Sequence, residues 1–151
     1  MDKLDPQADF TQALVKIARL YRQGVDEALS GLGLSDALAL PVVLLGRRPE
    51  GMRQNQLAEE LGVEGPSLVR LLDKLVETGL VERREDAADR RAKIVHLTDA
   101  GVAHSRRASR ALDTYRSALL NGVPGSDIAV AHSLLRRLEQ RLLARRDDSR
   151  P

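Results

Sequence analysis

Residues 54–84 read QNQLAEELGVEGPSLVRLLDKLVETGLVERR, and this segment carries the strongest structural signals in the chain. QNQLAEEL has its apolar residues at helical spacing, and Gly62 is suited to end that short helix. Shortly afterwards Gly65 can act as an N-cap and Pro66 suits the first position of a second helix, which Gly79 ends. A short helix, a tight turn and a second helix predict a helix-turn-helix.

The second helix of this segment, residues 66–78, separates into two chemically different faces. Its apolar face holds Leu68, Leu72 and Leu75, and its polar face presents Ser67, Arg70, Lys74 and Glu77. The polar face places two cations one turn apart on an element that fits the major groove of DNA. The alternative interpretation is a merely solvated face, which is the commoner fate of such residues, and the helix-turn-helix context favours DNA recognition.

A β-hairpin is predicted after the second helix, from strands LVERR at 80–84 and KIVHL at 93–97 joined by the charged loop EDAADRRA. Thr98 is predicted to cap the long helix that follows the hairpin. The loop carries Arg90 and Arg91, which could enter a narrow minor groove. Asp89 would then orient an arginine, since phosphate repels a carboxylate. We also expect DNA contacts from the basic residues of the flanking strands, Arg83, Arg84 and Lys93. A flexible loop of mixed charge is the alternative.

The fold class predicted from these signals is mainly α (α+β), a winged helix-turn-helix with terminal helices. We expect an N-terminal dimerisation helix within residues 1–33, a DNA-binding lobe over 34–98 and C-terminal dimerisation helices over 99–151. GRRPEGMRQ, before the first quoted helix, is predicted to be a loop. Both terminal segments carry apolar stripes, and the stripe of the last helix consists of Ile128, Ala131, Leu135, Leu138 and Leu142. These stripes exceed what one small lobe can cover, so a second copy of the chain is the expected partner.

Composition excludes several other classes of protein. The chain has no cysteine and only 2% aromatic residues, so thiolate metal sites and an aromatic platform for single-stranded nucleic acid are not expected. The three histidines lack partners at metal-ligand spacing, and no catalytic constellation or cofactor motif is present. We therefore expect no enzyme activity, metal or cofactor. The acidic, polar N-terminus is unlike a signal peptide, which predicts a cytoplasmic protein.

The predicted hairpin is the wing of a winged helix-turn-helix. In the wing and directly after it, Asp89, Arg91, Leu97 and Thr98 form the pattern D-x-R, five residues, then L-T. On this pattern, and on QLAEELGV, GPSLVRLLDKLVETGLV and LTDAG, the chain resembles the MarR family of bacterial regulators, and more closely its SlyA-type branch. These motifs cover residues 54–101, and the flanking helices follow the expected order. The chain departs from the family where its second helix, DALALPVVLL, lacks tryptophan and where VPGSD replaces the usual serine cap.

The resemblance implies a homodimer that places two winged lobes on a palindromic operator. It puts Pro66, Ser67 and Arg70 on base-contacting or groove-lining positions and Arg90 on the residue that enters the minor groove. Asp89 and Arg91 would form a structural ion pair at the wing. The expected function is a DNA-binding transcriptional regulator, most simply a repressor, with a small-molecule effector as an additional expectation. The alternative is a winged-helix protein-interaction module that does not bind DNA.

Overall fold

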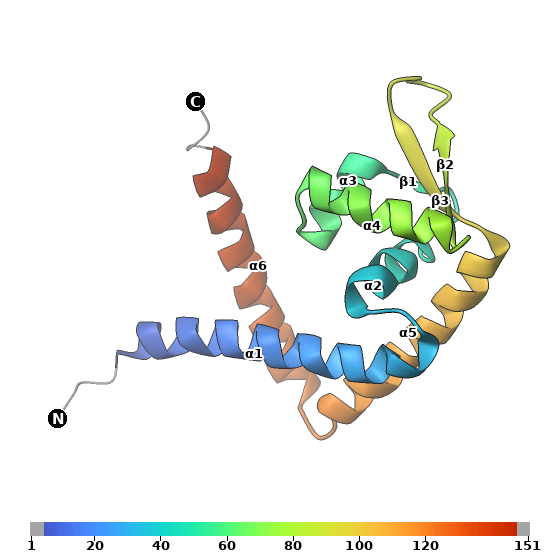
Figure 1. Ribbon diagram of the computed structural model, residues 1–151. Coiled ribbons are helices and arrows are strands. Elements are labelled where there is room, and N and C mark those ends of the chain that lie inside the picture. The colour runs from blue at the N-terminus through green and yellow to red at the C-terminus, as the bar shows by residue number, and fades with distance from the viewer. Residues whose placement is uncertain (1–4, 148–151) are drawn as a thin grey trace. The chain divides into compact units, whose positions relative to one another are not determined.

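The computed structural model describes residues 5–147, and the chain divides into two compact units, residues 1–116 and 117–151. Residues 1–4 and 148–151, the ends of the predicted terminal segments, lie outside the described residues. Figure 1 shows the elements in chain order: α1 (Pro6–Leu29), the 3-10 helix η1 (Ser30–Leu32), α2 (Asp36–Leu45), β1 (Met52–Arg53), α3 (Gln54–Leu61), α4 (Gly65–Glu77), β2 (Val81–Glu85), β3 (Lys93–Leu97), α5 (Asp99–Leu119) and α6 (Gly125–Asp147). The predicted winged helix-turn-helix class is confirmed.

The two helices of the helix-turn-helix lie where the sequence predicts them. α3 ends at Gly62, which adopts the left-handed conformation with φ 65°, and Gly79 after α4 does the same with φ 72°. The predicted N-cap of α4 was wrong by one residue, because Glu64 has the extended conformation of a cap and Gly65 is already helical. The turn between α3 and α4 is correspondingly short.

The sheet has three strands in the order β1-β3-β2, all antiparallel. The register of the predicted hairpin runs from Val81 opposite Leu97 to Glu85 opposite Lys93. The prediction of a loop before α3 was wrong at Met52, which pairs with Val95 as part of β1. A strand of two residues has no alternating pattern, so only its pairing partner reveals it.

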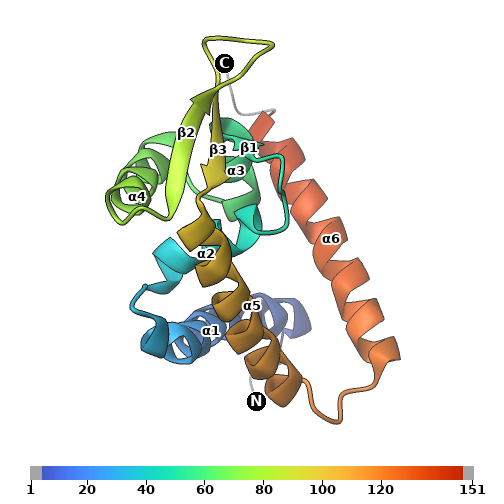
Figure 2. The same ribbon diagram turned by 90° about the vertical axis from the view of Figure 1, so that its right-hand side faces the viewer.

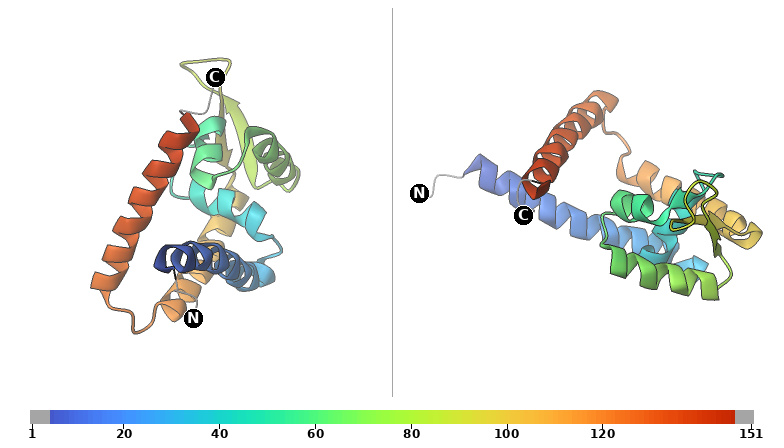
Figure 3. Two further views of the ribbon diagram at one scale, coloured as in Figure 1. Left: turned by 90° about the vertical axis from the view of Figure 1, so that its left-hand side faces the viewer. Right: turned by 90° about the horizontal axis from the view of Figure 1, so that it is seen from above.

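The core of the winged lobe fills the space between α2, α3, α4 and the sheet. Its fully buried members include Val42, Leu57, Leu68, Leu72, Leu75 and Val95. A second cluster joins the end of α1 to α2 and α5 through Val25, Leu29, Ala39, Val43, Ala108 and Leu112. Figures 2 and 3 show the hairpin projecting from the lobe beside α3 and α4, so the core fixes both elements in one body.

The start of α5 is tied to the loop that follows α4. The Thr98 hydroxyl donates to the Gly79 carbonyl at 2.6 Å and accepts from the Gly101 backbone N–H at 3.1 Å, which confirms the predicted cap. Gly101 lies against the backbone here, since an added Cβ would come within 2.0 Å of the Leu80 carbonyl oxygen. The packing of α5 on the lobe therefore requires glycine at this position.

Gly101→Ala is expected to lower the free energy of unfolding by about 1–3 kcal/mol, because the new methyl group meets backbone that cannot move aside. Thermal or urea unfolding measures the change. Gly125→Ala is the matched control, since no atom lies within 4 Å of an added Cβ there. Equal stability of the two variants would contradict this account of the junction.

Candidate nucleic-acid interface

The two faces of α4 are separated as the sequence predicts. Leu68, Leu72 and Leu75 are completely buried, and α4 is anchored in the lobe through them. The candidate residues Pro66, Ser67, Arg70 and Lys74 are all exposed. The side chains of Arg70 and Lys74 make no hydrogen bond or ion pair within residues 5–147, so both cations are available to an external anion. Because exposed cations on a helix suit phosphates and base edges, this face is chemically able to bind DNA.

Arg83, a predicted DNA contact, is instead committed to contacts within the lobe. Its guanidinium donates to the Asp73 carboxylate at 2.7 Å and to the Val69 carbonyl at 3.4 Å. These bonds tie β2 to α4, and they leave the Arg83 side chain only 28% exposed. A paired and half-buried guanidinium has less to offer a phosphate, so the structure favours a positioning role for this residue.

The other two basic strand residues are exposed and pair with neighbouring carboxylates. Arg84 pairs with Glu82 on the same strand, and Lys93 lies 3.7 Å from Glu85 across the hairpin. Exposed pairs of this kind are worth little and exchange readily. Both cations therefore remain candidates for contacts with the phosphates that flank the wing.

An ion pair that sequence reasoning missed anchors the base of the wing. Arg53 of β1 donates from Nε and Nη2 to Oδ2 of Asp86, at 2.8 and 2.5 Å. The other carboxylate oxygen of Asp86 accepts the backbone N–H of Ala88 at 2.9 Å, and the whole residue is only 7% exposed. The Ala88 N–H and the Arg53 guanidinium hold the pKa of the Asp86 carboxyl below its ordinary value of 3.8. Asp86 thus connects the wing to the strand that leads into α3.

Asp89 and Arg91, for which the resemblance implies an ion pair, are joined instead through the backbone of the wing. The carboxylate of Asp89 accepts a hydrogen bond from the backbone N–H of Arg91 at 3.0 Å, and the Asp89 carbonyl accepts the N–H of Ala92 at 2.9 Å. In the described part of the chain no ion pair joins the Asp89 and Arg91 side chains. Because only one residue separates Asp89 from Arg91, the Asp89 carboxylate shapes the turn by binding the Arg91 backbone N–H. The guanidiniums of Arg90 and Arg91 stay exposed.

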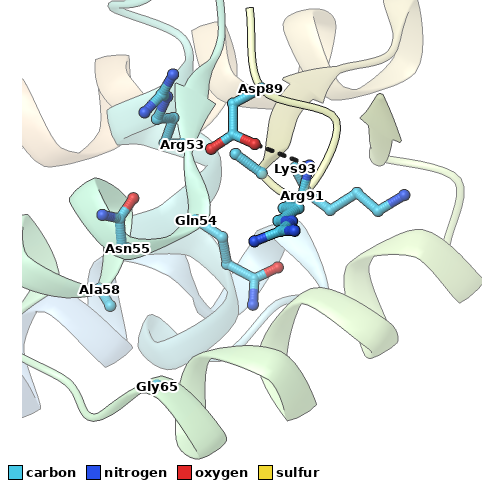
Figure 4. Close-up of a pocket in the computed structure, with 9 residues that line it drawn as sticks. Arg53, Gln54, Asn55, Ala58, Gly65, Asp89, Arg91 and Lys93 are labelled. Atoms are coloured by element: carbon cyan, nitrogen blue, oxygen red, sulfur yellow. Dashed lines mark hydrogen bonds between the residues drawn. The ribbon is translucent and has the colours of Figure 1, made fainter. Parts of the chain in front are cut away.

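A polar cleft of about 430 Å³ lies between the start of α3, the start of α4 and the wing. Its lining includes Arg53, Gln54, Asn55, Gly65, Asp89, Arg91 and Lys93. Figure 4 shows Gln54 and Arg91 pointing toward one another, with Gly65, the first residue of α4, lower in the view. Amide and guanidinium donors around a cleft suit phosphate oxygens. The polar run QNQ at 54–56 was the only sequence signal for this part of the site.

The cleft also shows that α4 and the wing lie on the same side of the lobe. Gly65 at the start of α4 and Arg91 of the wing line the same cavity, so one surface of the lobe contains both elements. Arg83 and the Arg53–Asp86 pair hold the hairpin to α4 and β1. A rigid surface with a cationic helix and an arginine-bearing wing has the parts that a winged helix uses on duplex DNA.

Asp86→Asn is expected to weaken DNA binding by roughly 3- to 10-fold, less than the loss of a direct base contact, because the wing loses its charged anchor. Since the folded-state pKa of Asp86 is lowered, the anchor is intact above pH 3.8 and is lost only as pH falls further. The anchor should therefore contribute equally to DNA binding by the parent protein at about pH 6 and at about pH 8.

Glu85→Gln is the matched control for this prediction, because it removes one negative charge from the same hairpin but breaks only an exposed pair with Lys93. If net charge alone governs binding, both variants will bind DNA more tightly than the parent protein. Weakening by Asp86→Asn with no weakening by Glu85→Gln, measured by fluorescence anisotropy, is the result that the anchor requires.

Within residues 5–147 no cluster of three or more His, Cys, Asp or Glu side chains is arranged to hold a metal ion. No single helix among these residues is long and apolar enough to span a membrane, although the sharply bent combination of α1, η1 and α2 reaches that threshold by length and composition.

Comparison with known proteins places these observations in a family. A model of the MarR family matches residues 32–92. The crystal structure of the transcriptional regulator PA3341 is 36% identical, with 89% of this chain and 98% of that chain covered and a TM-score of 0.82. The S. aureus MepR–DNA complex is 21% identical over 87% of this chain and 96% of that one, with a TM-score of 0.77. CouR from Rhodococcus jostii RHA1, bound to p-coumaroyl-CoA, is 24% identical over 91% and 95%, with a TM-score of 0.77.

Proposed function

Because this chain belongs to the MarR family of transcriptional regulators, we propose that it binds a palindromic DNA operator as a homodimer and represses transcription from it. The observation that carries the proposal is the common surface of α4 and the wing, on which Arg70, Arg90 and Arg91 are exposed. The chromosome lies in the cytoplasm of a bacterium, so the proposal also assigns the protein to that compartment.

In the proposed complex α4 enters the major groove. Pro66 and Ser67 allow close approach at its first turn, Arg70 reads base edges, and Lys74 contacts phosphate. Arg90 enters the minor groove and Arg91 lies beside it, while Arg84 and Lys93 contact the flanking phosphates. Arg83 positions the wing and does not contact DNA, because its guanidinium is bound to Asp73 of α4.

The proposed dimer uses the terminal segments, residues 1–33 and 99–151. Support comes from large apolar side chains that the single chain leaves exposed: Phe10, Val15, Ile17 and Leu20 on α1, and Ile128, Leu135, Leu142 and Leu143 on α6. Exposed apolar side chains in such numbers on one helix are typical of an interaction site. Two-fold symmetry would set two copies of α4 roughly 34–36 Å apart, in successive major grooves.

Within the family we assign the chain to the SlyA-type branch, on the motif formed by Asp89, Arg91, Leu97 and Thr98. We also propose that a small-molecule effector modulates DNA binding. The complex of CouR with p-coumaroyl-CoA supports this second proposal, because that protein has the same fold and holds a small ligand.

Selection of bound duplexes from a random pool tests the proposal. We expect enrichment of a palindrome whose half-sites are centred about one helical turn apart, and an affinity that falls steeply as salt rises, because phosphate contacts release counterions. No enrichment and no duplex affinity at low salt would contradict the proposal. That outcome, with a monomer in solution, would favour a protein-interaction module instead.

A further inference from the structure

The loop that joins α5 to α6 contains a pair of residues with a chemistry of its own. Residues 120–124 read LNGVP, and Asn121–Gly122 is the one asparagine–glycine pair in the sequence. Figure 2 shows this loop between the end of α5 and the start of α6. The backbone nitrogen that follows an asparagine can attack its side-chain amide, and glycine favours the attack because it has no side chain to block the approach. The pair is therefore a candidate for spontaneous modification.

Asn121 and Gly122 are accessible to each other and to water. Both residues are exposed, and no atom lies within 4 Å of the position that a Cβ on Gly122 would occupy. The neighbouring backbone bonds run from the Asn121 N–H to the Ala118 carbonyl at 3.4 Å and from the Val123 N–H to the Leu120 carbonyl at 3.1 Å. The Gly122 N–H and the Asn121 side chain make no hydrogen bond to any residue between 5 and 147, so neither is held back from reaction.

The loop also offers little resistance to the rotation that the attack needs. All five residues of the segment 120–124 are exposed, so few contacts hold it. Gly122 has φ 77°, and glycine populates both signs of φ about as readily, so its backbone can turn toward the Asn121 side chain. The other asparagine of the chain, Asn55, differs on each count, because it lies within α3 and Gln56 follows it.

The reaction balances with water as the only reactant. The Gly122 nitrogen forms a bond to Cγ of Asn121 and loses its proton, the bond from Cγ to the amide nitrogen breaks, and ammonia leaves. The five-membered succinimide then takes up one water molecule. Opening at one carbonyl gives aspartate, and opening at the other gives isoaspartate, in which the main chain runs through the former side chain. Both products carry a new negative charge.

We propose that Asn121 is a site of spontaneous deamidation and that the isoaspartate formed there loosens the connection between α5 and α6. The isoaspartate adds one carbon atom to the main chain inside the turn that Val123 closes onto Leu120, so this turn loses its present geometry. The new carboxylate also lies just beyond the carbonyl end of α5, where a negative charge is unfavourable. The consequence for the dimer rests on the proposed function. The modification itself does not.

Mass spectrometry of the ageing protein tests the site. The full chain is kept at mildly alkaline pH until a free peptide of residues 117–126 is half converted, which sets the time scale. We expect a gain of about 1 Da on the fragment that contains Asn121, and methylation of that fragment by an isoaspartyl methyltransferase. The gain should be slower at mildly acidic pH, because the attacking nitrogen must lose its proton.

Asn55 is the internal control, because the side chain of Gln56 hinders approach to the backbone nitrogen that would attack it. Asn121→Gln removes the site, since closure would then require a larger ring. The proposal is overturned if Asn121 keeps its mass while the free peptide converts, if Asn55 is converted equally, or if the gain in mass occurs without isoaspartate.

Asn121→Asp separates the effect of charge from that of the altered main chain, because it has the carboxylate on an ordinary backbone. Sedimentation of the aged parent protein, of Asn121→Asp and of aged Asn121→Gln measures assembly. The dimer dissociation constant of the aged parent protein should rise by about tenfold or more, and that of Asn121→Asp by less. Equal assembly of the aged parent and aged Asn121→Gln proteins would contradict the loosening of α5 and α6. A monomer before ageing would contradict the proposed dimer, while the mass measurement would still decide the modification.

Discussion

Arg70→Ala should weaken binding to the selected operator by about 1–3 kcal/mol, the scale of one good bidentate contact to a base pair. Arg70 lies on the exposed face of α4, and no partner within the described chain competes for its guanidinium. The same variant should discriminate less between the operator and a sequence changed at one position of the half-site, because the lost contact is specific to a base. Fluorescence anisotropy titrations on both duplexes measure the two effects.

Lys74→Ala and Arg110→Ala separate this role from a general effect of charge. Lys74→Ala should weaken binding about equally on both duplexes and reduce the salt slope by about one, as expected for a phosphate contact. Arg110 lies on α5 outside the proposed interface, so its removal should leave both affinities nearly unchanged. If the three variants lose affinity equally, α4 contributes to DNA binding only through its positive charge and reads no base pair.

The double variant Leu135→Glu and Leu142→Glu should convert the proposed dimer to a monomer and lower operator affinity by about 100-fold or more, because the second half-site then binds without linkage to the first. Both leucines lie on the predicted apolar stripe of α6 and are exposed in the single chain, at 47% and 62%. Their replacement therefore removes little from the packing of one chain. Light scattering gives the mass, and anisotropy gives the affinity.

Val130→Glu is the control for the dimer prediction. Val130 is 72% exposed on the same helix, but it lies outside the stripe that contains Leu135 and Leu142. The control should remain a dimer with the affinity of the parent protein. A double variant that stays dimeric, or a monomer that binds the operator as tightly as the dimer, would contradict the proposed assembly.

The sequence predicted the helices and the hairpin well because their signals are local. The leucines of α4 recur at helical spacing, and Gly62 and Gly79 adopt the left-handed conformation that their positions at helix ends suggested. Thr98 caps α5 as expected, because a cap needs only its own residue and the first turn of its helix.

Contacts between distant residues could not be predicted in this way. Arg53 and Asp86 are 33 positions apart, and no spacing rule relates a strand of two residues to the base of a wing. Arg83 looked like a DNA contact because the sequence shows its charge but not the Asp73 carboxylate beside it. The sequence therefore indicated the exposed cations of α4 and the wing, whose DNA contacts stay a prediction, but not the ion pairs that support them.

The natural absence of cysteine allows the most direct measurement, since Ser67→Cys and Arg90→Cys can each be labelled uniquely with an iron–EDTA reagent that cuts nearby DNA. On one operator duplex, a label at position 67 should cut within each half-site, and a label at position 90 should cut at the flanks where the wing lies. A label introduced by Ser126→Cys, at the start of α6, serves as the control and should cut neither region. Cutting from only one of positions 67 and 90, or the same pattern from all three labels, would contradict the claim that α4 and the wing bind a single duplex together.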